Sequence, residues 1–151
     1  MKRYLLDTNV LGAYLQGRPG ALSLARTWIH NDEAATSIVV YGELTEYLKS
    51  FPDFSSHQAA LRTLLRKVHP YPLTYALLEQ YADLRRAMRP PYGPGLIGDI
   101  DTIIAATALH YGLTLVTTDG DFTRVPDLSL MHIPLRSLKE QPGQHDADTY
   151  R

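Results

Sequence analysis

Short apolar runs alternate with longer amphipathic stretches along most of the chain. Runs of mainly apolar or β-branched residues at 3–9, 34–40, 113–118 and 128–134 predict buried strands. A further extended segment, residues 69–73, contains two prolines, which exclude a helix interior and favour an edge strand. The pattern therefore predicts five strands.

The stretches between these runs have the length and composition of helices. In chain order they cover residues 10–15, 21–30, 41–50, 55–68, 74–89 and 101–112. Thr74 and either Ser55 or Ser56 are the expected N-caps of two helices, because a hydroxyl oxygen can accept a hydrogen bond from the free amides of a first turn. Gly112 is the expected end of the last helix.

Strands that alternate with helices predict an α/β fold with a mostly parallel sheet. We expect a three-layer α/β/α sandwich around a five-stranded sheet. A chain of 151 residues suits one domain, which we place at residues 1–138. Residues 139–151 are polar and are expected to form a flexible C-terminal tail.

Composition narrows the class of protein further. Hydrophobic residues make up 44% of the chain, which supplies a core and argues against disorder. Cysteine is absent, which excludes disulfides and thiolate metal sites from this sequence. The first apolar run is broken at Asp7 and Asn9, and no run reaches the length of a membrane span. We therefore expect a soluble, cytoplasmic protein.

The net charge of −1 gives no support for nucleic-acid binding by the surface as a whole. The charge is uneven, however, because the segment 61–90 contains six Lys or Arg residues and only two acids, Glu79 and Asp83. The six are Arg62, Arg66, Lys67, Arg85, Arg86 and Arg89. Two interpretations stay open: solvated helix faces, or a basic rim for a polyanion.

Acidic residues recur where strands end and helices begin. Asp7 ends the first strand, Glu43 is expected in the first turn of the helix after the second, and Asp119 follows the fourth. Asp99 and Asp101 begin the helix that precedes the fourth strand. Because parallel strands present their carboxyl ends at one edge, these side chains can converge.

Two explanations apply to such a set of acids. Each one alone can be an ordinary helix cap or first-turn acid. Converging carboxylates, in contrast, repel one another unless a divalent cation is bound, and oxygen ligands suit Mg²⁺ or Mn²⁺. Histidines at the spacing of a zinc site are absent from the sequence.

Helix geometry separates Asp99 from Asp101. Residues two apart point in directions that differ by roughly 200° around a helix, so both cannot face one site from one regular helix. Asp99 follows Gly98 and suits the N-cap or a loop ligand, whereas Asp101 lies in the first turn and can point toward the sheet edge.

Four motifs in this order resemble the PIN domain and, within it, the VapC-type toxin ribonucleases of bacterial toxin–antitoxin pairs. YLLDTNVL resembles the first motif and TSIVVYGEL the second. DTIIAATALHYGLTLVTTDGDF resembles the third and fourth together. The resemblance covers residues 4 to about 138. It implies a PIN-like fold and hydrolysis of RNA phosphodiester bonds with Mg²⁺ or Mn²⁺ as cofactor.

The resemblance also implies roles for individual residues. Four acids are carried over as metal ligands and catalytic groups: Asp7, Glu43, Asp101 and Asp119. Thr8, Asn9 and Thr117 match polar residues that support the acids. Asp99 has no counterpart among the four acids and is either a cap or an additional ligand or supporting group. Asp121 is expected to cap the turn before Phe122.

RNA must be held beside an acidic centre that repels it. Arg85, Arg86 and Arg89 are candidates for a positive margin that contacts the backbone, and Tyr92 is a candidate for stacking on a base. The resemblance further implies a VapB-like antitoxin partner and a homodimer. The segments 41–48 and 75–88 are candidate dimer helices, with core packing as the alternative.

Two rival functions are consistent with parts of the sequence. A PIN-fold scaffold would bind RNA or protein without cleavage. A phosphatase with Asp7 as covalent nucleophile would need a second acid two residues later, where Asn9 stands. A receiver-like phosphoacceptor would need a lysine at a late strand end, where Thr117 and Thr118 stand.

Overall fold

The computed structural model describes residues 1–140 and contains one five-stranded sheet in the order β3-β2-β1-β4-β5. Every neighbouring pair of strands is parallel. The strands are β1 (Tyr4–Leu6), β2 (Ala34–Ser37), β3 (His69–Tyr71), β4 (Thr114–Thr117) and β5 (Leu130–His132). The predicted α/β class and the five-stranded, mostly parallel sheet are confirmed, and the proline-containing β3 is an edge strand as predicted.

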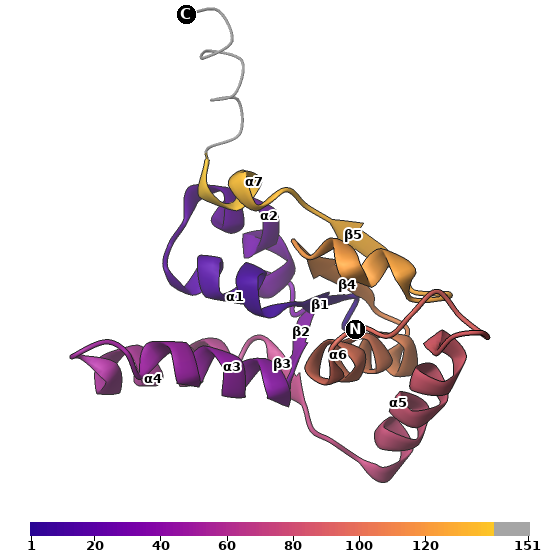
Figure 1. The fold of residues 1–151 in the computed structure, drawn as a ribbon. Coiled ribbons are helices and arrows are strands. Elements are labelled where there is room, and N and C mark those ends of the chain that lie inside the picture. Colours follow the sequence, from indigo (N-terminus) through magenta and orange to yellow (C-terminus); the bar gives the residue numbers. More distant parts are fainter. Residues whose placement is uncertain (141–151) are drawn as a thin grey trace, which may run out of the picture.

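Helices cover the sheet to give the predicted layers. Figure 1 shows α1, α2 and α7 grouped on one side of the sheet and α5 with α6 on the other, while α3 and α4 project together to the left. The helices are α1 (Thr8–Leu15), α2 (Pro19–His30), α3 (Ile38–Leu48), α4 (Phe54–Leu64), α5 (Tyr75–Met88), α6 (Asp99–Tyr111), the 3₁₀ helix η1 (Gly120–Arg124) and α7 (Leu135–Lys139). The last two are short helices that the periodicity did not predict.

The core lies where the central strands meet the helices. Leu5, Leu6 and Leu115 have no exposed surface, in keeping with strands covered on both faces. On α6, Ala105 and Ala106 are also fully buried, and small side chains of this kind let a helix pack close to its neighbours. A rigid sheet and helix therefore support the residues at the carboxyl edge.

Helix caps decide where several elements begin and end. The predicted second strand stops at Ser37 instead of Val40, because the Ser37 hydroxyl accepts a hydrogen bond from Val39 N at 3.3 Å and starts α3. Local capping thus prevails over the strand propensity of the β-branched residues that follow. Thr74 caps α5 and Gly112 ends α6 with φ +65°, both as predicted.

One predicted cap is wrong. α4 begins at Phe54 with Asp53 in the N-cap position, so Ser55 and Ser56 lie inside its first turn and cap nothing. The predicted 139–151 tail lies outside the described residues from position 141 on, and the 1–138 domain boundary stays a prediction. Among the helices of residues 1–140, none combines the length and the apolar character needed to cross a membrane.

Candidate active site

Two acids reach the carboxyl edge of the sheet on neighbouring strands. β1 and β4 are paired in parallel with Leu6 opposite Val116, so Asp7 and the loop that carries Asp119 leave the sheet at the same level. The Asp7 amide continues this pairing by donating to the Val116 carbonyl at 3.0 Å. The predicted convergence of these two positions follows from that register.

Asp7 is held firmly and is almost fully buried, with 6% of its surface exposed. One carboxylate oxygen, Oδ1, accepts from Thr8 N at 2.8 Å as the N-cap of α1. The other, Oδ2, accepts from Thr117 Oγ1 at 2.6 Å. Burial raises the pKa of Asp7, while these hydrogen bonds from Thr117 and Thr8 act to lower it.

Thr117 joins the two strand ends. Its hydroxyl donates to Asp7 and also accepts from the Asp119 amide at 3.0 Å. A second link lies beside it, where Asn9 Nδ2 donates to Thr118 Oγ1 at 3.1 Å. The loop after β4 is therefore tied to the start of α1, and Thr117, Thr8 and Asn9 occupy the supporting positions expected of them.

Glu43 reaches the same site from α3. Because α3 begins at Ile38, Glu43 lies in the second turn and not in the first turn as predicted. Thr8 Oγ1 donates to Glu43 Oε1 at 2.6 Å. Thr8 thereby contacts Asp7 through its amide and Glu43 through its hydroxyl. The two acids are thus linked by one residue.

Asp101 completes the set from the first turn of α6. Desolvation by burial, followed by the negative charges of Asp7, Asp119 and Glu43, raises the pKa of Asp101 to about 6. Within residues 1–140 its carboxylate accepts no hydrogen bond that could offset these effects. The four predicted acids thus share one site and repel one another.

The donor chemistry of this site fits a hard divalent cation. Carboxylate oxygens are the ligands that Mg²⁺ and Mn²⁺ prefer. A cation would also relieve the repulsion that, after burial, contributes to the raised pKa of Asp101. In the part of the chain that the structure describes, no three acidic or histidine side chains are yet close enough to hold an ion together. Three or more of the acids would therefore have to move closer together to coordinate one ion.

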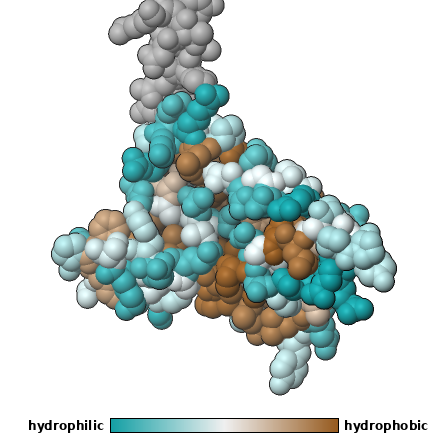
Figure 2. All heavy atoms as spheres, viewed as in Figure 1, coloured by the Kyte–Doolittle hydropathy of each residue, from teal (hydrophilic) through white to brown (hydrophobic). Residues whose placement is uncertain are grey.

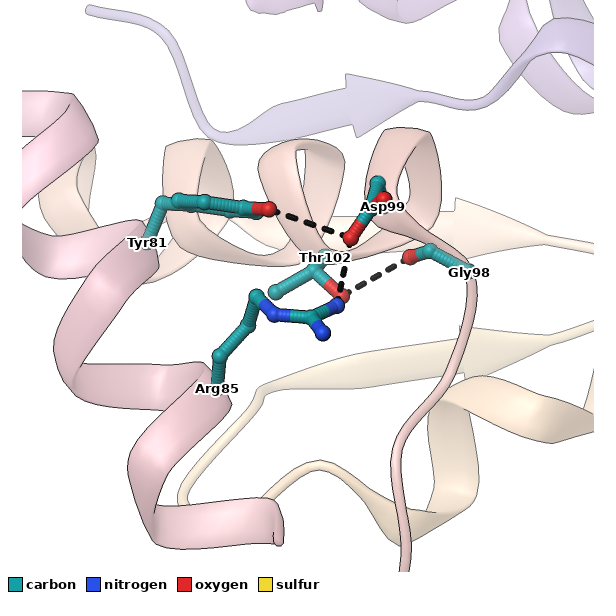
Figure 3. A network of polar contacts seen from close by, with 5 residues as sticks. All are labelled: Tyr81, Arg85, Gly98, Asp99 and Thr102. Carbon is teal, nitrogen blue, oxygen red and sulfur yellow. Dashed lines mark hydrogen bonds and ion pairs between the residues drawn. The ribbon is translucent and has the colours of Figure 1, made fainter.

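Asp99 lies on the other side of the α6 start. The N-cap position belongs to Gly98, so the prediction that Asp99 caps α6 is wrong. Its carboxylate instead accepts from the Tyr81 hydroxyl at 3.1 Å and pairs with the Arg85 guanidinium, both from α5. Figure 3 shows these side chains pointing toward one another across the two helices.

Asp121 also differs from its predicted role. Asp119 is the residue that caps η1, because its Oδ1 accepts from Asp121 N at 2.8 Å. Asp121 itself forms an ion pair with Arg124 at 3.3 Å. The cap thus falls two residues earlier than predicted.

Sequence reasoning missed two residues near the site, Tyr81 and His132. Tyr81 was assigned no role, although its spacing of four from Arg85 places both on one helix face. His132, at the end of β5, lies with Nε2 3.2 Å from the Thr118 carbonyl oxygen, beside Asp119. The sequence carries no comparable signal for His132, because its proximity depends on the pairing of β5 with β4.

The remaining basic candidates gather at the end of α5. Arg86, Arg89 and Tyr92 line one surface cavity of about 520 Å³. Tyr92 is 84% exposed, which leaves its ring free for contact. Arg85 differs from these residues because it is already paired with Asp99.

Comparisons with known proteins agree with this fold. A family model described as the PIN domain matches residues 4–128. The chain belongs to the PIN domain family. This PIN domain has no significant match among curated protein sequences.

Solved structures share the fold of this PIN domain. A chain in the crystal structure of VapBC2 from Rickettsia felis, bound to a promoter DNA fragment, has a TM-score of 0.74 and 23% identity, covering 86% of this chain and 98% of that one. A chain of DNA-bound VapBC from Salmonella typhimurium gives 0.75 and 17%, covering 87% and 98%. A chain of FitAcB from Neisseria gonorrhoeae gives 0.69 and 24%, covering 85% and 96%.

One cavity of this PIN domain is lined by Thr8 and Asn9, the residues that follow Asp7. It has a volume of about 320 Å³ and reaches from Thr8 and Asn9 along α1 to the start of α7. Its apolar wall includes Leu44, Tyr47 and Leu135. An apolar recess therefore opens directly beside the residues that support Asp7 and Glu43.

Proposed function

We propose that this PIN domain is a metal-dependent endoribonuclease that hydrolyses RNA phosphodiester bonds, with Mg²⁺ or Mn²⁺ as cofactor. The observation that carries the proposal is the Asp7 centre: a nearly buried carboxylate with two donors, joined through Thr8 to Glu43 and through Thr117 to Asp119. A purely structural acid would not need three further acids around it.

The roles of the residues follow from their contacts. Asp7, Glu43, Asp101 and Asp119 would hold the metal, which when bound neutralises the scissile phosphate and supplies a nucleophile from water. Thr117 and the Thr8 amide keep the Asp7 carboxylate in one orientation.

We propose that RNA binds over the four acids and that its phosphate backbone contacts the basic end of α5. Arg86 and Arg89 supply positive charge there, and the exposed Tyr92 ring supplies a stacking surface in the same cavity. Arg85 contributes to this margin only through its charge, because its guanidinium is bound to Asp99.

The biological setting is proposed to be a VapBC-type toxin–antitoxin pair, with this chain as the toxin. The cavity lined by Thr8 and Asn9 offers an antitoxin segment an apolar wall, and Thr8 connects it to Asp7 and Glu43. A basic side chain on that segment would be attracted to the acids. Binding there would block access of RNA to the site.

A homodimer is also proposed. Figure 2 shows apolar side chains gathered in the lower middle of the face, where Figure 1 places α6 and the start of α3. Ile38 and Ile100 of these helices are 37% and 41% exposed. A sedimentation experiment at micromolar concentration tests this, and a monomer would contradict it.

The second candidate function is a PIN-fold scaffold that binds RNA or protein without cleavage. The observation that favours it is the spacing of the acids, which form no group of three metal ligands within residues 1–140. The Asp-nucleophile phosphatase has less support, because Asn9 is bound to Thr118 and supplies no acid.

A cleavage assay tests the proposal. Purified protein is incubated with mixed RNA in the presence of Mn²⁺, Mg²⁺ or a chelator. We expect new 5′ and 3′ ends in the metal-containing reactions and none with the chelator or with Asp7→Asn. Binding of RNA without cleavage under all conditions would favour the scaffold. Release of phosphate from small phosphomonoesters, with intact RNA, would favour the phosphatase.

A further inference from the structure

The start of α6 carries Asp101 and has no side-chain cap. Its N-cap is Gly98, which has no side chain to accept from the first amides. The preceding segment, residues 90–98, is rich in proline and glycine and includes Gly95 at φ +119°. Inside the turn, both the amide and the hydroxyl of Thr102 donate to the Gly98 carbonyl at 2.8 Å. These hydrogen bonds lie within the turn itself, and the buried Ile97 and Thr102 pack it against the domain.

A further attachment comes from α5 through Asp99. The Tyr81 hydroxyl and the Arg85 guanidinium both reach Asp99 Oδ1, and the Arg85 guanidinium carbon lies 6.0 Å from the centre of the Tyr81 ring. The Arg85 side chain is 24% exposed and that of Asp99 is 68% exposed, so the pair is partly open to solvent. Figure 3 shows this network at the point where α6 begins.

The charges suit the helices that carry them. Arg85 lies in the last turn of α5, where a positive charge interacts favourably with the helix dipole. Asp99 lies in the first turn of α6, where a negative charge does the same. The pair therefore joins two helix ends of opposite partial charge.

Helix geometry carries the effect across the turn. Because Asp99 and Asp101 differ by roughly 200° in direction, Asp99 faces α5 while Asp101 faces the other acids. If contacts at Asp99 fix the rotation of this turn, they also fix the direction in which the Asp101 side chain leaves the helix. The Asp101 carboxylate accepts no hydrogen bond within residues 1–140, so its position depends on how this turn is held, by the buried face of α6 and by the contacts of Asp99.

We propose that Arg85 and Tyr81 act through Asp99 as a clamp that positions Asp101. Arg85 is then a positioning residue and not an RNA contact. The clamp rests on the proposed function for its catalytic consequence, because Asp101 matters only if it binds metal. Its structural part, the ordering of the first turn of α6, stands on the contacts alone.

The test compares variants that remove one member of the clamp, Arg85→Ala and Asp99→Asn, with a matched control, Arg26→Ala. Arg26 is an exposed arginine of α2 that forms no ion pair within residues 1–140. Three quantities are measured: Mn²⁺ affinity without RNA, kcat and KM for RNA cleavage, and hydrogen exchange at the Thr102 amide. Arg85→Lys is the conservative variant.

We expect Arg85→Ala and Asp99→Asn each to weaken Mn²⁺ affinity and to lower kcat by about tenfold, the size typical of residues that orient a metal ligand. KM should change less than twofold, and Thr102 should exchange faster. Arg85→Lys should recover part of the loss, because it keeps the charge without the planar fork. Arg26→Ala should match the wild type in all three quantities.

The double variant Arg85→Ala/Asp99→Asn decides whether the two residues act as one. If they do, its loss equals that of either single variant. Additive losses, or a change in KM alone with unchanged Mn²⁺ affinity, would overturn the clamp and return Arg85 to RNA binding. A wild-type protein that neither binds Mn²⁺ nor cuts RNA would refute the proposed function, and the exchange at Thr102 would then still decide the clamp.

Discussion

Asp7 and Asp101 occupy the same site but are held in opposite ways. Asp7 follows a central strand, is 6% exposed and accepts hydrogen bonds from Thr8 and Thr117. Asp101 lies in the first turn of α6, and the side-chain contacts of this turn with α5 are made by Asp99, on the opposite face of the helix. The Asp101 carboxylate accepts no hydrogen bond within residues 1–140. The sheet thus builds one half of the site firmly, while the other half depends on helix packing and on charge.

The difference shows in how each acid would respond to a metal. Hydrogen bonds to Asp7 favour its charged form and offset part of the burial that raises its pKa. Asp101 has only unfavourable influences, from burial and from its acidic neighbours. A bound cation would therefore stabilise the Asp101 side of the proposed site more than the Asp7 side.

The largest expected effect is the loss of either acid. Asp7→Asn and Asp101→Asn should each lower RNA cleavage by more than about 100-fold, beyond the range of residues that only orient a ligand. The folded state should persist in both, as judged by circular dichroism. Cleavage by Asp101→Asn within tenfold of the wild type would show that Asp7 works without it.

The second-largest effect is expected when Asp7 loses one of the groups that donate a hydrogen bond to it. Thr117→Val keeps the shape of the side chain but leaves Asp7 Oδ2 and the Asp119 amide without their partner. We expect cleavage to fall by about 10- to 100-fold and the free energy of unfolding to fall by about 1–3 kcal/mol. Thr118→Val, which loses only the bond from Asn9, is the control and should have the smaller effect on both.

A smaller effect is expected in the pH dependence of stability, which should reveal the titration of Asp101. Because the pKa of folded Asp101 is about 6, above its usual 3.8, the folded protein binds this proton more tightly than the unfolded protein does. The resulting stabilisation is full below the unfolded pKa and is lost as the pH rises through 6. In chelator, the Tm of the wild type relative to Asp101→Asn should therefore decline between pH 5 and pH 7.5. A constant difference in Tm would contradict the raised pKa.

The smallest expected effect concerns the metal-free protein at pH 7.5. Replacing Asp101 with Asn removes one of several repelling charges, so the Tm in chelator should rise by a few degrees. Adding Mn²⁺ should raise the Tm of the wild type but not that of the variant. Equal metal-induced shifts in both proteins would show that the ion binds elsewhere.

The features that the sequence predicted well depend on local order along the chain. Asp7 and Asp119 could be placed at one edge because each follows an apolar strand and parallel strands end together. Thr74 and Gly112 were predicted because caps act within a few residues. The proline-containing strand at 69–73 was an edge strand for the same local reason.

The features that the sequence did not predict depend on contacts between distant elements, or on which of several nearby polar residues becomes the helix cap. The pairing of Asp99 with Arg85 requires α5 and α6 to lie side by side, which periodicity does not reveal. Glu43 moved to the second turn because one hydroxyl, on Ser37, ended the strand early. The cap before η1 went to Asp119 instead of Asp121 for a similar reason.

The central claim is that one metal site unites the firmly held acid with the loosely held one. Titration of the protein with Mn²⁺ at pH 7.5, followed by calorimetry, tests this most directly. The account predicts saturable binding in the wild type, its loss in both Asp7→Asn and Asp101→Asn, and no change in the control Arg26→Ala. The same weak, unsaturated binding in all four proteins would contradict it.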